Sequence, residues 1–372
     1  MPIEMSLTDE HEELRSTLRA FLNECSDEAT VREQMATERG YDPDVWTQMA
    51  EQMGLAGLII PEEFGGAGYG YVELLVVMEE MGRALLCAPY LSTAVFAANT
   101  LMHCADEKSQ KELLTEIAAG RMIATVAHAE SNGRWDIDGI EMTAQRSGDQ
   151  WTLRGTKSWV LDGGSAQVLL VVARTDSGLA LFRVDPAAPS LRQEAVPPLD
   201  LTRKLSEIHF EDSPAELISS GDQTDSFERV LALTTAALSA EQMGGAQWCL
   251  ETAVEYAKTR LQFGRPIGSY QAIKHKCADM LVETEFARSA AYAACFSAAE
   301  QEEDFLEIAD LAQSTCSEAF FHAAAETIQI HGGMGFTWEL PVHLYFKRAK
   351  ASDLLFGDAT HHRERLADRV GL

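Results

Sequence analysis

The stretch Arg260–Gln271, RLQFGRPIGSYQ, separates two long segments with a helical hydrophobic pattern. Gly264 and Pro266 end the first helix, and the pattern resumes at Tyr270. An arginine at a helix end, followed by a break and a new helix start, presents a guanidinium together with exposed backbone groups. That combination suits a pyrophosphate, although a plain helix–helix corner explains the same residues equally well.

Both sides of this stretch are helical. The pattern covers the chain from Asp225 to the break at Phe263, then 270–299 and 305–329, and finally a shorter segment from Pro341 to near Gly357. Four apolar-faced helices with short connections are typical of a helix bundle. The third helix stops at a second glycine-rich motif, Gln329–Phe336, QIHGGMGF, where a flat ligand can approach the backbone closely. A simple helix C-cap is the alternative.

The first half of the chain divides into a helical and a β-rich part. Residues 6–120 contain amphipathic segments at 8–22, 71–83 and 109–117, the first of them opened by a capping Thr8. From 123 to 220 the period changes to two, in short runs separated by Gly, Asp, Ser and Pro. Such spacing favours a small antiparallel barrel or sandwich. The glycine loop 65–70 lacks the G-x-G-x-x-G spacing and favours a tight turn.

The order of these parts predicts an α+β, mostly α fold without a Rossmann sheet, because strands and helices do not alternate. We expect an N-terminal all-α domain at 1–122, a middle β-barrel at 123–222 and a C-terminal four-helix bundle at 223–372.

Composition excludes several classes of function. The 30 Lys and Arg residues stand against 58 Asp and Glu, a net charge of −28, which disfavours nucleic acid and anionic membranes. The seven cysteines form no C-x-x-C pair, and there is no H-E-x-x-H, so no metal site and no disulfide framework are expected. No signal peptide or membrane-length apolar run is visible, which indicates a cytoplasmic protein.

Three motifs together carry a resemblance to a known family. PEEFGGAG (61–68), RLQFGRPIGSYQ (260–271) and QIHGGMGF (329–336), in this order and at these distances, resemble the acyl-CoA dehydrogenase family of flavoproteins. The resemblance covers essentially the whole chain and implies the three-domain fold given above. It also implies FAD, oxidation of an acyl-CoA thioester to its 2,3-enoyl form, a tetramer, and electron-transfer flavoprotein as electron acceptor.

The resemblance implies two halves of a flavin site. Residues that reach the flavin of a neighbouring subunit are Arg260, Phe263, Gln271, Gln329, Gly332 and Gly333. Trp159, in a Trp-Val-Leu strand where the family has Trp-Ile-Thr, contacts the flavin of its own subunit. On this own-subunit side the hydroxyl groups expected at Ala129, Trp135 and Leu161 are missing.

The catalytic base that the family reaction requires is also missing. The usual glutamate after the last bundle helix falls at Phe356, and the alternative position on the first bundle helix falls at Thr234. Asp358 lies two residues past the first position, and Glu241 lies about two turns after Thr234 on the same helix face. Either is a candidate for a relocated base. The structural alternatives are a turn or surface carboxylate for Asp358 and a buried partner of a cation for Glu241.

Three hypotheses follow. The chain resembles the smaller subunit of the α2β2 bacterial acyl-CoA dehydrogenases for steroid side chains, in which a larger homologous partner supplies the base. Alternatively, it is a self-sufficient homotetramer with a relocated base, or a flavin-free scaffold or acyl-CoA-binding relative. The acyl chain, and the choice between dehydrogenase and oxidase, stay open at this point.

Overall fold

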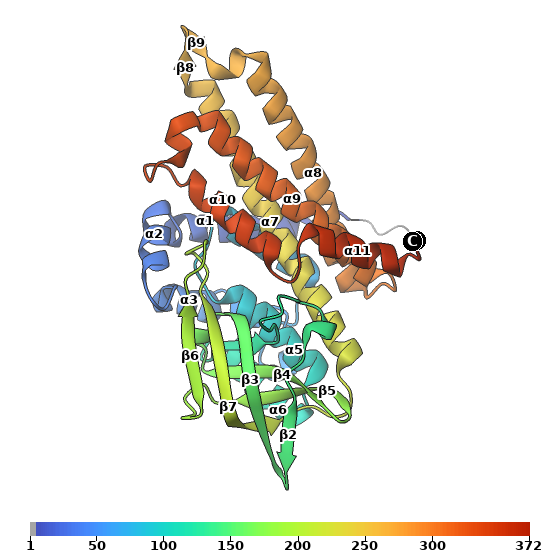
Figure 1. Ribbon diagram of the computed structural model, residues 1–372. Coiled ribbons are helices and arrows are strands. Elements are labelled where there is room, and N and C mark those ends of the chain that lie inside the picture. The colour runs from blue at the N-terminus through green and yellow to red at the C-terminus, as the bar shows by residue number, and fades with distance from the viewer. Residues whose placement is uncertain (1–4) are drawn as a thin grey trace. The chain divides into compact units, whose positions relative to one another are not determined.

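A computed structural model describes residues 5–372, so the first four residues of the predicted domain 1–122 lie outside the described part of the chain (Figure 1). The helices are α1 (Asp9–Cys25), α2 (Glu28–Ala36), α3 (Pro43–Glu51), α4 (Tyr71–Arg83), α5 (Ala98–Cys104), α6 (Glu107–Ala118), α7 (Thr224–Thr259), α8 (Gln271–Glu300), α9 (Phe305–His331), α10 (Val342–Leu354) and α11 (Ala359–Arg369). The strands are β1 (Ala124–Ala127), β2 (Ala144–Ser147), β3 (Gln150–Leu161), β4 (Val168–Thr175), β5 (Gly178–Val184), β6 (Leu191–Val196), β7 (Leu205–Leu217), β8 (Leu261–Gln262) and β9 (Arg265–Pro266). The predicted fold class, mostly helical with a middle sheet, is confirmed.

The chain forms two compact units that do not follow the order of the sequence. One contains the chain up to Arg32, Tyr71–Leu86 and Thr235–Leu372, and the other contains Glu33–Gly70 and Cys87–Thr234. The helices α1 and α4 therefore belong with the bundle helices, whereas α3, α5 and α6 belong with the sheet. The three predicted domain boundaries stay predictions.

The bundle unit is built on α9, which packs against α8, α10 and α11. Small side chains let these helices approach closely: Ala287 and Ala291 of α8 share a core cluster with Cys316 and Ala319 of α9. The Thr8 hydroxyl accepts a hydrogen bond from the backbone N–H of His11 and caps α1, as the sequence predicts. Helix α11, after Gly357, has no counterpart in the sequence prediction.

The sheet unit is a seven-stranded sheet with the order β1-β4-β5-β7-β3-β2 and with β6 also paired to β7. Its strands alternate inward apolar residues, such as Leu153, Phe182 and Ile208, which form one core. A bridge between Thr143, just before β2, and Arg174 of β4 curls the sheet back on itself. The sheet is not wholly antiparallel, because β1 pairs in parallel with β4.

Within residues 5–372, no helix combines the length and the apolar character that crossing a membrane demands.

Candidate functional site

The stretch between α7 and α8 forms an exposed hairpin of β8 and β9, which Figure 1 shows at the end of the two long helices. At its tip Phe263 is 91% exposed, with a positive φ of 52°, a conformation unfavourable for a bulky residue. The Arg265 guanidinium lies 4.0 Å from the centre of the Tyr270 ring, and the Tyr270 hydroxyl donates to the Gln262 carbonyl at 3.3 Å. The hairpin is thus internally braced, and its aromatic tip points away from the chain.

Arg260 differs from Arg265 in having its charge available. It is exposed at the end of α7, and its guanidinium makes no hydrogen bond or ion pair with any residue between 5 and 372. Gln271, the first residue of α8, is exposed as well.

The second motif lies at the same end of the bundle. Gln329 is exposed in the last turn of α9, and Gly332 follows with φ 60°. No atom lies within 4 Å of where a Cβ would stand on Gly332 or Gly333, so both backbones are open to a ligand. The Tyr256 ring of α7, one turn before the first motif, stacks on His331 of the second motif with 4.0 Å between ring centres. This contact keeps the two motifs at the same end of the bundle.

These residues fit the cofactor that the sequence suggests. A free guanidinium, two exposed amide side chains, an exposed aromatic ring and open glycine backbones suit a flat dinucleotide with an anionic pyrophosphate. Arg260, Phe263, Gln271, Gln329, Gly332 and Gly333 would hold it, and they present a surface rather than an enclosed pocket.

The two positions to which the resemblance assigns the base, 356 and 234, hold no carboxylate. Phe356 is buried, with 4% of its surface exposed and a positive φ of 63°. Its carbonyl accepts a hydrogen bond from Nε2 of His362 at 3.2 Å, while Nδ1 of His362 lies 2.6 Å from Asp310. Thr234 is fully buried, and its hydroxyl donates to the Val230 carbonyl at 2.8 Å.

The two candidate replacement bases have structural roles. Asp358 caps α11, since its carboxylate accepts the backbone N–H of His361 at 2.9 Å. Glu241 is buried and lies 2.7 Å from a guanidinium nitrogen of the equally buried Arg348. These are the two structural alternatives that the sequence analysis weighs against a relocated base.

The loop after β1, which carries the own-subunit half of the predicted flavin site, is anchored by a buried ion pair. Lys157 donates to the Glu130 carboxylate at 2.7 Å and to the His128 carbonyl at 2.9 Å. Burial lowers the pKa of Lys157 to about 8 in spite of Glu130. Burial, followed by the Lys157 charge, lowers the pKa of His128 to about 3, so this imidazole is neutral.

Trp159 lies against an aromatic cluster of the same unit. The rings of Trp135 and Trp159 have centres 6.1 Å apart, and Trp135 also lies 5.5 Å from His128. Ala129 and Leu161 are buried apolar residues. The own-subunit half therefore does not fit a flavin in the way that the exposed hairpin does.

Sequence reasoning missed Glu130, Lys157 and His128. The polar run Arg154–Ser158 does not mark Lys157 as a buried charge that needs a partner. The identity of that partner depends on the sheet register, which the sequence did not specify.

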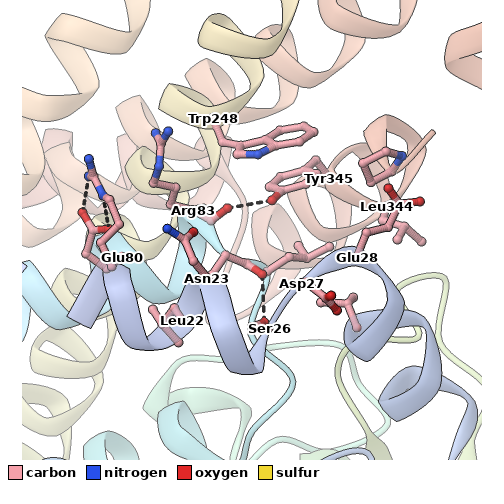
Figure 2. A pocket seen from close by; sticks show the side chains of 15 residues that line it. Leu22, Asn23, Ser26, Asp27, Glu28, Glu80, Arg83, Trp248, Leu344 and Tyr345 are labelled. Atoms are coloured by element: carbon pink, nitrogen blue, oxygen red, sulfur yellow. Dashed lines mark hydrogen bonds and ion pairs between the residues drawn. The ribbon is translucent and has the colours of Figure 1, made fainter. Parts of the chain in front are cut away.

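Among the described residues there is also a cavity of about 370 Å³, lined by α1, α2, α4, α7 and α10 in the bundle unit (Figure 2). The ring of Trp248 stacks on Tyr345 at 3.6 Å along one wall, and the Tyr345 hydroxyl donates to the Arg83 carbonyl at 2.6 Å. None of the predicted site residues lines this cavity.

Comparison with known proteins agrees with the geometry. Family models for acyl-CoA dehydrogenase match at residues 8–121 (N-terminal domain), 125–213 (middle domain) and 225–371 (C-terminal domain). The acyl-CoA dehydrogenase IpdE2 of Mycobacterium tuberculosis is 35% identical over 98% of this chain and 99% of its own length. The chain belongs to the acyl-CoA dehydrogenase family.

Two solved structures of this family resemble the chain over nearly its full length. The steroid acyl-CoA dehydrogenase Tcur3481-Tcur3483 aligns with a TM-score of 0.88 and 30% identity, covering 97% of this chain and 98% of the other. The ChsE4-ChsE5 complex from Mycobacterium tuberculosis aligns with a TM-score of 0.90 and 27% identity, covering 99% of each chain. The chain is therefore an oxidoreductase of acyl-CoA dehydrogenation, in a family that is generally FAD-dependent.

Proposed function

We propose that this chain is one subunit of a heteromeric, FAD-dependent acyl-CoA dehydrogenase, and that a homologous partner chain supplies the catalytic base. The chain's own contribution is a half-site: the exposed hairpin with Arg260 and Phe263, together with Gln271, Gln329 and the glycines 332 and 333. The assembly that we expect is α2β2, with this chain as the smaller subunit.

The observation that carries the proposal is the buried Phe356 at the usual base position. Removal of the proton α to a thioester carbonyl needs a general base whose pKa is near the working pH. A phenyl ring cannot accept that proton. The side chains at three other positions do not supply the base either. The Thr234 hydroxyl donates to a carbonyl of its own helix. Asp358 caps α11, and Glu241 is paired with Arg348.

The contrast between the two half-sites supports a partner rather than an inactive relative. A chain that had lost flavin chemistry altogether would have no reason to keep a 91% exposed phenylalanine beside an available guanidinium. Exposing this aromatic surface to water is unfavourable in free energy, and a partner that buries it removes the penalty. FAD bound there would supply the hydride acceptor. Arg260, Phe263 and the open backbone at Gly332 and Gly333 would hold and orient it, the guanidinium through charge-assisted hydrogen bonds.

Names of relatives support the assembly and the substrate class. Tcur3481-Tcur3483 and ChsE4-ChsE5 are two-component names, and the first is a steroid acyl-CoA dehydrogenase. We propose a bulky, steroid-derived acyl-CoA as substrate and electron-transfer flavoprotein as electron acceptor.

The test compares this chain alone with this chain co-expressed with a longer homologue that carries glutamate at the base position. Turnover of an acyl-CoA is followed with an artificial electron acceptor. We expect turnover only in the complex, abolished by Glu→Gln in the partner and retained in Asp358→Asn and Glu241→Gln. Turnover by the chain alone that disappears in either of these two variants would establish a relocated base and overturn the proposal.

A further inference from the structure

The strand β3 carries Trp159 at a break in its pairing with β7. The register shifts between Lys157 and Val160, and Trp159 has a positive φ of 52°. Bulges of this kind re-aim a side chain out of the regular alternation and are frequent beside functional sites. The neighbouring Ser158 donates its backbone N–H to the Ala129 carbonyl at 2.9 Å, so the loop after β1 lies directly against the bulge.

Trp135 of that loop lies between Trp159 and the interior of the unit. Its ring is 6.1 Å from Trp159 on one side, at 32°, and 5.5 Å from His128 on the other. His128 is in turn packed against Phe96 and Phe227, with ring centres 5.3 and 5.7 Å away. The Trp135 ring thus connects Trp159 to an aromatic cluster that reaches into the core.

The loop that carries Trp135 is held by hydrogen bonds within this unit. The Glu130 carboxylate accepts the backbone N–H groups of Glu141 and Met142 at 3.1 and 2.9 Å, which joins the two ends of the loop. Within it, Asn132 donates to the Gly139 carbonyl at 2.8 Å, and Asp136 accepts the Gly139 N–H at 2.9 Å. The Trp135 side chain is therefore fixed against Trp159 by its backbone as well as by ring packing.

We infer that Trp135 closes this chain's own flavin half-site by packing its ring against Trp159, so that a heteromer containing this chain binds flavin only at the sites it completes on its partner. This inference rests on the proposed function. It adds the residue that keeps flavin out of this chain's own half-site. Loss of hydroxyl groups at positions 129 and 161 would weaken a flavin contact, whereas an indole in place of a small side chain fills the space.

The test measures FAD content, not activity, in the complex of this chain with its partner. Complexes that contain wild-type chain, Trp135→Ser, Ala129→Thr/Leu161→Thr or the triple variant are titrated with FAD, and bound flavin is determined after gel filtration. We expect about one FAD per pair of chains for the wild type and the double variant. A second, weaker site should appear with Trp135→Ser and approach two FAD per pair in the triple variant.

The first flavin serves as an internal control, because it needs the hairpin of this chain and therefore reports that each variant is folded and assembled. Trp151→Ser is the matched control: Trp151 packs on Phe182 elsewhere in the sheet unit, at 5.5 Å, and its loss should add no flavin site. The inference is overturned if neither Trp135 variant gains flavin, or if the double variant gains it with Trp135 in place. Full occupancy in the isolated wild-type chain would instead overturn the proposed function.

Discussion

At the scale of single residues, Arg260 should control flavin affinity. Its guanidinium makes no hydrogen bond or ion pair within residues 5–372, so Arg260→Ala should weaken FAD binding without breaking an internal polar interaction. A charge-assisted hydrogen bond contributes about 1.5–3 kcal/mol, or roughly 10- to 150-fold in the FAD dissociation constant of the complex. Lys258→Ala removes an equal charge from an exposed side chain two residues earlier and should leave affinity unchanged. Equal losses in both variants would mean that only the general charge of this region matters.

His128 should make the protein sensitive to acid. Burial, followed by the Lys157 charge, lowers its pKa from 6.5 to about 3. Between the two pKa values His128 is protonated in the unfolded chain and neutral in the folded chain. The free energy of unfolding is therefore highest above pH 6.5 and falls as the pH is lowered toward 3. From pH 7 to pH 5 this amounts to about 2 kcal/mol. Urea unfolding at both pH values should give a smaller difference for His128→Phe. An unchanged difference would contradict the neutral, buried imidazole.

Residues within contiguous motifs could be predicted from the sequence, and residues defined by tertiary contact could not. The break between α7 and α8 and the glycine-rich end of α9 can be predicted because glycine, proline and arginine are close together in the chain, whereas the β8–β9 hairpin in that break cannot. Trp135 was noted only as a missing hydroxyl, because its contact with Trp159 depends on the bulge in β3.

At the scale of elements, α4 and α7 cross through paired glycines. A Cβ on Gly82 would stand 2.0 Å from the Glu241 carbonyl oxygen, and one on Gly244 would stand 1.9 Å from that of Glu79. Although alanine is the better helix former, Gly82→Ala should lower the unfolding free energy by about 2–3 kcal/mol, because backbone must move. A Cβ on Gly164 would have the Ser206 hydroxyl at 3.6 Å as its nearest neighbour, so Gly164→Ala should change the unfolding free energy by less than about 0.5 kcal/mol. Thermal unfolding compares the two, and a stabilised Gly82→Ala protein would refute the close crossing.

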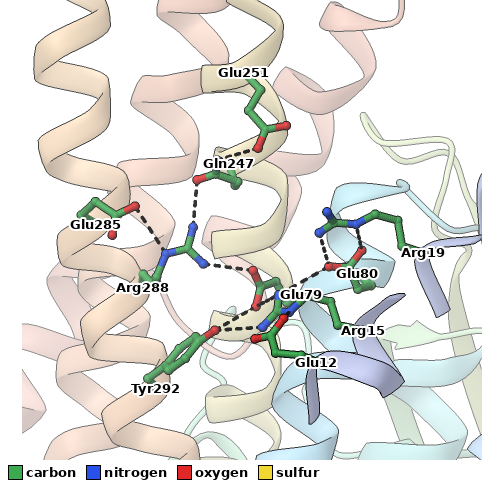
Figure 3. A network of polar contacts seen from close by, with 10 residues as sticks. All are labelled: Glu12, Arg15, Arg19, Glu79, Glu80, Gln247, Glu251, Glu285, Arg288 and Tyr292. Atoms are coloured by element: carbon green, nitrogen blue, oxygen red, sulfur yellow. Dashed lines mark hydrogen bonds and ion pairs between the residues drawn. The ribbon is translucent and has the colours of Figure 1, made fainter. Parts of the chain in front are cut away.

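A buried ion-pair network joins α1, α4 and α8 (Figure 3). Glu79 is 4% exposed and lies 2.7 Å from Arg15, 3.0 Å from Arg288 and 3.3 Å from the Tyr292 hydroxyl. Glu79→Gln leaves two half-buried guanidinium groups without their shared charge, and we expect a loss of about 3 kcal/mol in unfolding free energy. Glu285→Gln, at the exposed rim and 3.4 Å from Arg288, should lose less than about 1 kcal/mol. Chemical denaturation measures the unfolding free energy of both variants. Similar losses in Glu79→Gln and Glu285→Gln would show that burial of the ion pairs does not determine their contribution.

Helices with a strong hydrophobic period can be predicted from the sequence, whereas short strands and weakly apolar helices cannot. The segment 71–83 coincides with α4, since its apolar stripe has the helical period. The parallel pairing of β1 with β4 was missed, because a four-residue, fully buried strand shows no alternation. Helix α11 was also missed: its mean hydropathy is low and only Ala359 and His362 are buried.

At the scale of the whole molecule, we propose that the chain presents one half of a flavin site and has filled the other. The hairpin tip at Phe263 is 91% exposed, whereas Phe356 is 4% exposed where a base would stand. A homotetramer of such chains would contain only damaged sites. A heteromer with a base-bearing partner would contain complete sites, about one for each pair of chains.

The most direct measurement is the flavin content and mass of the purified assembly, obtained from the visible spectrum and native mass spectrometry. We predict a colourless isolated chain, and an α2β2 complex with the partner that carries about one FAD per pair of chains. A yellow homotetramer of this chain with about one FAD per chain would contradict the account.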